Sequence, residues 1–148
     1  MHKKPLISVI TVCYNSYEML QRTIKSVRMQ TYSEIEYIVI DGASKDSTLR
    51  LIKENEDIIN LWISEPDNGL YYAMNKGLDL ANGDYVIYIN AGDMFYMPDT
   101  LEKIFENHPD DVDIYYGDTM ILAHNQKELR SRRLSPPKHL TKCSFRRG

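Results

Sequence analysis

The stretch Asp84–Asp93, with the sequence DYVIYINAGD, decides the fold because an apolar run leads directly into a carboxylate. The run Tyr85–Ile89 has the length and the β-branched and aromatic content of a buried strand. In open α/β sheets, ligands bind in the crevice at the carboxyl ends of such strands. We therefore expect Asp93 to lie in a crevice, where its carboxylate suits a divalent cation that also contacts phosphate oxygens. Alternatively, Asp93 belongs to a turn that caps the helix expected after Pro98.

The composition is that of one ordinary globular domain. The chain has 148 residues, of which 43% are hydrophobic and 26% charged. Its apolar runs have the length of strands, so we expect no membrane-spanning helix. The first run contains Ser8 and Thr11 and lacks a cleavage motif, so we interpret it as a strand rather than a signal peptide. Cys13 and Cys143 are too few for a disulfide framework, which favours a cytoplasmic location.

Charge is distributed unevenly along the chain. Residues 1–126 contain 10 Lys and Arg against 20 Asp and Glu, whereas residues 127–148 contain 8 against 1. The basic end could meet a phosphate-bearing ligand or an anionic membrane surface, or it could be a solvated strand and loop. We expect no nucleic-acid partner for a body that is acidic overall.

Strand-like and helix-like segments alternate on both sides of the opening stretch. The expected strands are Leu6–Val12, Glu36–Asp41, Asn60–Ser64, Asp84–Asn90 and Val112–Tyr116. The expected helices are Tyr17–Gln30, Ser47–Glu54, Leu70–Ala81 and Asp99–Asn107. This alternation predicts an α/β fold with a mostly parallel sheet and helices on both faces.

The pattern weakens after Asp118. Met120–Ala123 and Leu129–Leu134 are expected to form further strands, and the Ser-Pro-Pro sequence at 135–137 then breaks the chain. We therefore divide the chain into a core over residues 1–118 and an incomplete second region over residues 119–148.

Polar clusters follow the first two expected strands. Tyr14 could stack on a nucleobase, and Asn15 could bind a backbone group or cap the next helix. Asp41 could accept a hydrogen bond from a ribose hydroxyl or a base N–H. Ser44 and Asp46 also fit the turn that starts the next helix.

Two further clusters follow the third and fourth strands. Asn68-Gly69 predicts a tight turn, and the free N–H groups that open the following helix attract anions. Asn75 lies inside that helix, where it is unfavourable unless it reaches a ligand or a neighbouring strand. Asn90–Asp93 is the fourth cluster. Because parallel strands end at one edge of their sheet, we expect all four clusters at one site.

Taken in this order, the clusters resemble the family-2 glycosyltransferases, which have the Rossmann-like GT-A fold. The resemblance covers roughly residues 5–118. Its motifs are Tyr14-Asn15, Asp41-Gly-x-Ser-x-Asp-x-Thr48, Asp67-Asn-Gly-Leu-Tyr-x-Ala-Met-Asn-Lys-Gly77 and Asn90-Ala-Gly-Asp93. The sequence looks most similar to the branch that builds capsule, O-antigen and exopolysaccharide in bacteria.

The resemblance implies a reaction and a set of site residues. A sugar would pass, with inversion, from a nucleoside diphosphate donor, expected to be a UDP-sugar, to a hydroxyl of a glycan or lipid-linked glycan. Asp93 would coordinate Mn²⁺ or Mg²⁺ on the donor diphosphate. The residues implied to bind the nucleotide sugar are Val12, Tyr14, Asn15, Asp41, Ser44, Asn68, Gly69, Asn75, Ala91 and Gly92.

The sequence departs from the commoner family pattern in three places. Gly42 follows Asp41 where many relatives have a second acid, and Gly92 stands where the metal motif often has another carboxylate. The catalytic base usually lies in the segment after the nucleotide-binding half, so we expect it beyond Gly148. Asp118 is the one candidate base that we single out within the chain.

Other nucleotide-binding classes lack their motifs here. Residues 11–16 contain no glycine, which argues against a dinucleotide-binding Gly-x-Gly-x-x-Gly loop, and no Gly-Lys-Ser/Thr sequence indicates a P-loop. The remaining alternative is a non-catalytic sugar-nucleotide-binding module of the same fold. Peripheral contact with the inner face of the membrane and a homodimer both stay open.

Overall fold

The computed structural model describes residues 4–106, 112–122 and 131–135. The chain divides into two compact units, residues 1–107 and residues 108–148. Within the described ranges, no helix is both long enough and apolar enough to cross a bilayer.

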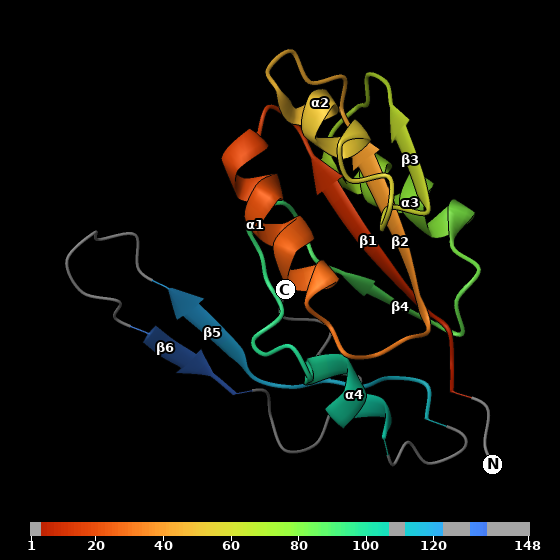
Figure 1. The fold of residues 1–148 in the computed structure, drawn as a ribbon, viewed down its shortest axis with the longest axis vertical. Helices are drawn as coiled ribbons and strands as arrows, with labels where there is room; N and C mark the ends of the chain where they lie inside the picture. The colour runs from red at the N-terminus through yellow and green to blue at the C-terminus, as the bar shows by residue number, and fades with distance from the viewer. Residues whose placement is uncertain (1–3, 107–111, 123–130, 136–148) are drawn as a thin grey trace. The chain divides into compact units, whose positions relative to one another are not determined.

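The first unit is built on a four-stranded parallel sheet in the order β3-β2-β1-β4 (Figure 1). Its strands are β1 (Ile7–Cys13), β2 (Ile35–Asp41), β3 (Leu61–Ser64) and β4 (Tyr85–Tyr88). The chain runs outward from β1 to β3 and then returns to the other side of β1 as β4. The strand order therefore reverses between β1 and β4, and in open α/β sheets ligands bind at the carboxyl end of such a reversal.

Helices cover both faces of this sheet. They are α1 (Tyr17–Arg28), α2 (Thr48–Lys53), α3 (Leu70–Leu80) and α4 (Thr100–Phe105). In Figure 1, α1 and α2 lie in front of the sheet and α3 lies behind it. The buried apolar residues of α1 are Leu20, Ile24 and Val27, the face that their spacing predicts. The α/β class with helices on both faces is thus confirmed.

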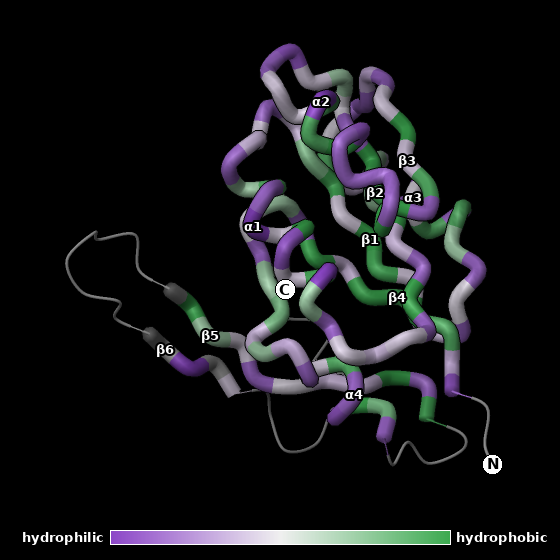
Figure 2. Tube along the Cα trace, in the orientation of Figure 1, coloured by the Kyte–Doolittle hydropathy of each residue, from purple (hydrophilic) through white to green (hydrophobic). Residues whose placement is uncertain are grey.

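One cluster of the core lies between the two central strands and α3. Ile10, Val12, Ile38 and Ile40 form one buried cluster with Ala73 of α3. A Cβ on Gly77 would come within 2.5 Å of Ile10, so α3 can approach β1 closely because residue 77 has no side chain. Figure 2 shows the hydrophobic residues concentrated on β1, β2 and β4, whereas the loops at the carboxyl ends of β2 and β3 are largely hydrophilic.

The second unit corrects one sequence prediction. The expected strand Val112–Tyr116 is wrong, because residues 112–118 have no regular secondary structure. The alternation of Val112, Ile114 and Tyr116 predicts a half-buried strand, yet Ile114 and Tyr116 are 56% and 49% exposed. Local alternation shows that a segment can be a strand but does not supply the partner strand that a sheet requires.

The two later strands are found within two residues of their predicted starts. β5 (Thr119–Leu122) and β6 (Ser131–Leu134) pair in antiparallel orientation. Ala123, Leu129 and Arg130, which belong to the expected strands, lie outside the described residues.

Candidate functional site

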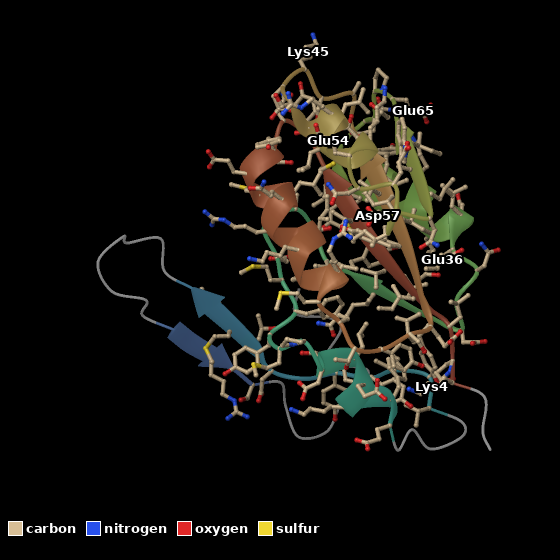
Figure 3. All side chains as sticks on the ribbon, in the orientation of Figure 1. Lys4, Glu36, Lys45, Glu54, Asp57 and Glu65 are labelled. Atoms are coloured by element: carbon tan, nitrogen blue, oxygen red, sulfur yellow. The ribbon has the colours of Figure 1, made fainter. Side chains whose placement is uncertain are left out.

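The carboxyl edge of the sheet brings together all four predicted clusters. Backbone hydrogen bonds join the ends of neighbouring strands: Gly42 N–H donates to Cys13 O (2.9 Å) and Glu65 N–H donates to Asp41 O (3.0 Å). On the other side of β1, Ala91 N–H donates to Val12 O (3.2 Å). Figure 3 shows Lys45 and Glu65 at this end of the unit, with Lys4 and Glu36 at the opposite end.

The loops after β1 and β2 are bonded to each other in both directions. Asn15 N–H donates to Ser44 Oγ (2.8 Å), and Lys45 N–H donates to Asn15 Oδ1 (2.8 Å). Asn15 adopts a positive φ of 46°, a conformation that asparagine tolerates better than most residues. The Asn15 residue therefore holds the two loops together.

Asp46 and Thr48 extend this connection to the start of both helices. Tyr17 N–H donates to Asp46 Oδ2 (3.4 Å), and Ser16 N–H donates to Thr48 Oγ1 (3.0 Å). Hydrogen bonding from the Thr48 side chain holds the pKa of Asp46 below its ordinary value. The start of α1 is thus satisfied by side chains of the loop after β2, whereas Thr48 N–H of α2 donates to Asp46 Oδ1 of its own loop (2.9 Å).

Asp41 lies beneath these loops and is 0% exposed. Its carboxylate accepts hydrogen bonds from Ser44 N–H (3.0 Å), from Ser44 Oγ and from Ser64 Oγ (2.6 Å). The Cys13 thiol, 3.7 Å from Asp41 Oδ1, is also buried, and its burial together with the Asp41 charge raises the pKa of that thiol. In this arrangement the carboxylate shapes the loop, and the prediction that Asp41 contacts a base or ribose stays a prediction.

Two residues at the carboxyl end of β1 differ sharply in exposure. Val12 is 5% exposed and belongs to the core, whereas Tyr14 is 60% exposed. An exposed aromatic ring at the end of a buried strand leaves a free face for stacking. Of the two residues implied to grip the base, Tyr14 has the side chain that is accessible.

The loop from β3 into α3 presents polar groups to solvent. Asn68, Gly69 and Asn75 are exposed, and Gly69 precedes α3 with a φ of 116° that a residue with a side chain rarely adopts. Asp67 Oδ1 accepts a hydrogen bond from Gly69 N–H (2.8 Å), which fixes the turn. The opening N–H groups of α3 therefore lie at the carboxyl edge, where they favour an anion.

The turn Asn90–Asp93 is held by Thr23 of α1, which is 0% exposed. Thr23 Oγ1 donates to Asp93 O (2.8 Å) and accepts from Gly92 N–H (3.0 Å). Gly92 has a φ of 107°, and Ala91 is anchored by its bond to Val12. Asn90 Oδ1 is buried without a hydrogen-bond partner among the described residues.

The Asp93 side chain is exposed, and within the described ranges no hydrogen bond or ion pair engages its carboxylate. A free carboxylate on a rigid turn at the strand reversal fits a divalent cation that completes its shell with phosphate oxygens and water. No group of three or more His, Cys, Asp or Glu that could hold a metal is found among the residues the structure describes.

Asp118, the candidate base within the chain, belongs to the second unit and directly precedes β5. Its Oδ2 accepts from Arg133 Nε (2.6 Å) and pairs with Arg133 Nη2. Hydrogen bonds from Ser135 and then Arg133 lower the pKa of Asp118. A general base needs a pKa near the working pH, so this pairing argues against Asp118 in that role.

Two residues of the site, Thr23 and Ser64, escape sequence reasoning, and a third, Asp67, has no role assigned from the sequence. Thr23 has the position of any buried residue on an amphipathic helix, and Ser64 closes a short strand. Asp67 is visible in the sequence as the start of the Asn-Gly motif, and its Asp-x-Gly spacing matches a side-chain turn.

The fold and motifs agree with those of a known family. The family model "Glycosyl transferase family 2" matches residues 8–147, and the chain therefore belongs to this family. An uncharacterized glycosyltransferase of Mycobacterium tuberculosis is 43% identical over 107 residues, which are 72% of this chain and 41% of that protein. A Bacillus subtilis glycosyltransferase with an inferred role in teichuronic acid biosynthesis is 36% identical over 106 residues, 70% of this chain and 42% of that protein. The chain thus spans about two fifths of the length of each relative.

Solved structures agree with the GT-A assignment. TarS of S. aureus (residues 1–349), in complex with UDP-GlcNAc, matches with a TM-score of 0.61 and 26% identity over 66% of this chain and 29% of that one. A Pyrobaculum calidifontis mannosyltransferase, in complex with GDP-Man and Mn²⁺, has a TM-score of 0.64 and 24% identity, covering 78% of this chain and 35% of that chain. The predicted family and fold are both confirmed.

Proposed function

We propose that this chain is the donor-binding part of a glycosyltransferase that moves a sugar from a nucleoside diphosphate to an acceptor hydroxyl. One observation carries the proposal. In a chain of glycosyl transferase family 2, the carboxyl edge of one sheet gathers an exposed aromatic ring, a helix N-terminus and a carboxylate with no partner among the described residues. These are the groups that a base, a diphosphate and its metal ion require.

The donor is proposed to be a UDP-sugar. Tyr14 would stack on the base, while the loops joined by Asn15 and Ser44 form the floor beside it. Asn68, Gly69 and Asn75 would lie along the ribose and phosphates, next to the opening N–H groups of α3. TarS, which is 26% identical, binds UDP-GlcNAc and supports this choice of donor class.

Asp93 would hold a Mn²⁺ or Mg²⁺ ion together with oxygens of the donor diphosphate, with Ala91 and Gly92 shaping the turn. When bound, the ion would neutralise negative charge on the departing nucleoside diphosphate. The proposal rests on the exposure of Asp93, since the mannosyltransferase that binds Mn²⁺ is similar enough to support the fold alone. Thr23 would keep the carboxylate in place through its two bonds to the turn.

Inversion would require a carboxylate base on the acceptor side of the sugar. Because Asp118 is paired with Arg133, we propose that the base lies outside the described residues. The acceptor would be a glycan or a lipid-linked glycan in cell-surface polysaccharide biosynthesis, in line with the relative whose inferred role is in teichuronic acid biosynthesis. A location at the cytoplasmic face of the membrane would suit such an acceptor and the basic residues 127–148.

The engagement of Asp118 also favours a second candidate function. A sugar-nucleotide-binding module without catalytic activity would need the donor site but no base. Both candidate functions use the same donor site at the carboxyl edge. An assay for transfer of the sugar to an acceptor distinguishes them.

Calorimetric titration with UDP, GDP, dTDP and CDP, each with and without Mn²⁺, tests the donor site. We expect saturable binding of UDP that Mn²⁺ strengthens, and loss of the Mn²⁺ effect in Asp93→Ala. Binding that ignores Mn²⁺ would refute the metal site. A folded chain that binds none of the four nucleotides would refute the donor site itself.

A further inference from the structure

Asp67, at the carboxyl edge, leaves one of its two carboxylate oxygens available to a ligand. Asp67 is half-buried, and its Oδ1 is occupied by Gly69 N–H at 2.8 Å. Its Oδ2 has no hydrogen-bond partner in the part of the chain that the structure describes. Asp67 therefore combines a fixed position with a free acceptor atom.

The position of Oδ2 follows from the space around Gly42. A Cβ on Gly42 would lie 2.9 Å from Asp67 Oδ2 and 3.3 Å from Tyr14 Cδ2. The carboxylate and the aromatic ring therefore flank the same glycine, and no side chain separates them at that point. They come from different loops, after β3 and after β1, and both lie close to the position that a Cβ of residue 42 would occupy.

An aromatic ring face beside an oxygen that can only accept hydrogen bonds distinguishes a base with an N–H on its edge from one with a lone pair there. A base stacked on Tyr14 would present its edge to the carboxylate, which can accept a hydrogen bond but cannot donate one. Uracil carries an N–H at position 3, whereas cytosine has a lone pair at that atom that the carboxylate would repel.

We propose that Asp67 Oδ2 accepts the N3–H of a uracil base stacked on Tyr14, and that this contact sets the preference of the donor site for uracil over cytosine. The inference rests on the proposed nucleotide-sugar function and adds to it the residue that recognises the base. Asp41, by contrast, has its carboxylate occupied by Ser44 and Ser64.

Titration of the full chain with UDP and with CDP, in the presence of Mn²⁺, tests this inference. A site built to hydrogen-bond a base edge should favour UDP by about tenfold or more. In Asp67→Asn the UDP preference should be lost or reversed, because Gly69 N–H keeps the amide oxygen at the Oδ1 position and leaves the NH₂ group, which can only donate, facing the base. The control is Asp79→Asn on the exposed surface of α3, which makes the same charge change and should keep the wild-type preference.

Gly42→Ala provides a second variant that leaves Asp67 chemically intact. Its Cβ would displace the carboxylate from the ring, so the UDP preference should again be reduced. Wild-type preference in both Asp67→Asn and Gly42→Ala would overturn the inference while leaving the donor site standing, and so would equal affinity of the wild type for UDP and CDP. Absence of any nucleotide binding by the wild type would overturn the donor site and this inference together.

Discussion

β2 and β4 flank β1 in the same sheet, and the carboxylates at their carboxyl ends, Asp41 and Asp93, have opposite environments. Asp41 is fully buried and accepts hydrogen bonds from Ser44 and Ser64, whereas Asp93 is exposed and its carboxylate has no partner among the described residues. On the β2 side of the carboxyl edge, the polar groups therefore hold the loops in place. The β4 side holds its turn through backbone atoms and leaves the side chain for a ligand. Substitution of Asp41 should therefore lower the free energy of unfolding, whereas substitution of Asp93 should reduce metal-dependent nucleotide binding.

Asp41→Asn should give the largest loss of stability. The substitution places an NH₂ group against donors that now face carboxylate oxygens, and hydrogen bonds to charged groups contribute about 1.5–3 kcal/mol each. We expect the free energy of unfolding to fall by about 3 kcal/mol in urea titration. An unchanged midpoint would contradict the structural role of this carboxylate.

Thr23→Val should cause the next largest effect. The two side chains have nearly the same shape, but valine cannot bond to Gly92 N–H and Asp93 O. Leaving these buried partners unsatisfied should cost about 2 kcal/mol. Because the turn loses its anchor, the strengthening of UDP binding by Mn²⁺ should also weaken. Retention of the full Mn²⁺ effect would show that the turn holds Asp93 without α1.

Gly92→Ala tests backbone conformation in the same turn. The nearest atom to a Cβ at this position is Met19 Sδ at 3.6 Å, so no steric clash is expected. The φ of 107° is unfavourable for alanine and should cost about 1–2 kcal/mol. Thermal unfolding of Gly92→Ala beside Gly69→Ala, whose φ is 116° with open space around it, gives a matched comparison. A neutral result at both positions would show that these turns relax freely.

Asp93→Ala should change stability least and ligand binding most. An exposed carboxylate without a partner contributes within about 0.5 kcal/mol to folding. The urea midpoint should therefore match that of the wild type, while the Mn²⁺-dependent component of UDP binding disappears. A stability loss comparable to that of Asp41→Asn would place Asp93 among the structural residues and remove the contrast between the two sides.

The sequence predicts the sheet of the first unit well because strand and helix periods are local properties. Burial of Ile24 and Leu20 follows from their spacing in the same way. The strand expected at Val112–Tyr116 is wrong because pairing depends on a partner that the local pattern does not specify. Local sequence patterns also do not predict contacts between loops that are far apart in the sequence. Asp67 and Gly42 are separated by 24 intervening residues, and only the folded chain places that carboxylate beside Tyr14.

The roles of the individual acids are equally dependent on the fold. Asp41 and Asp93 both end apolar runs, so the sequence predicts a ligand contact for each of them. Burial separates the two, because β2 is a central strand whose end is covered by the loop containing Ser44. β4 lies at the edge of the sheet, and its end continues into a turn that is open to solvent.

The most direct test of the account is a crystal structure of this chain with UDP and Mn²⁺, using the anomalous signal of manganese to locate the ion. The account predicts a manganese peak within about 2–2.5 Å of an Asp93 carboxylate oxygen, as is usual for oxygen ligands of divalent cations. It also predicts that the uracil ring stacks on Tyr14 and that the diphosphate lies between the uracil ring and the manganese ion. Manganese bound away from Asp93, or UDP bound away from the carboxyl ends of β1 and β4, would contradict it.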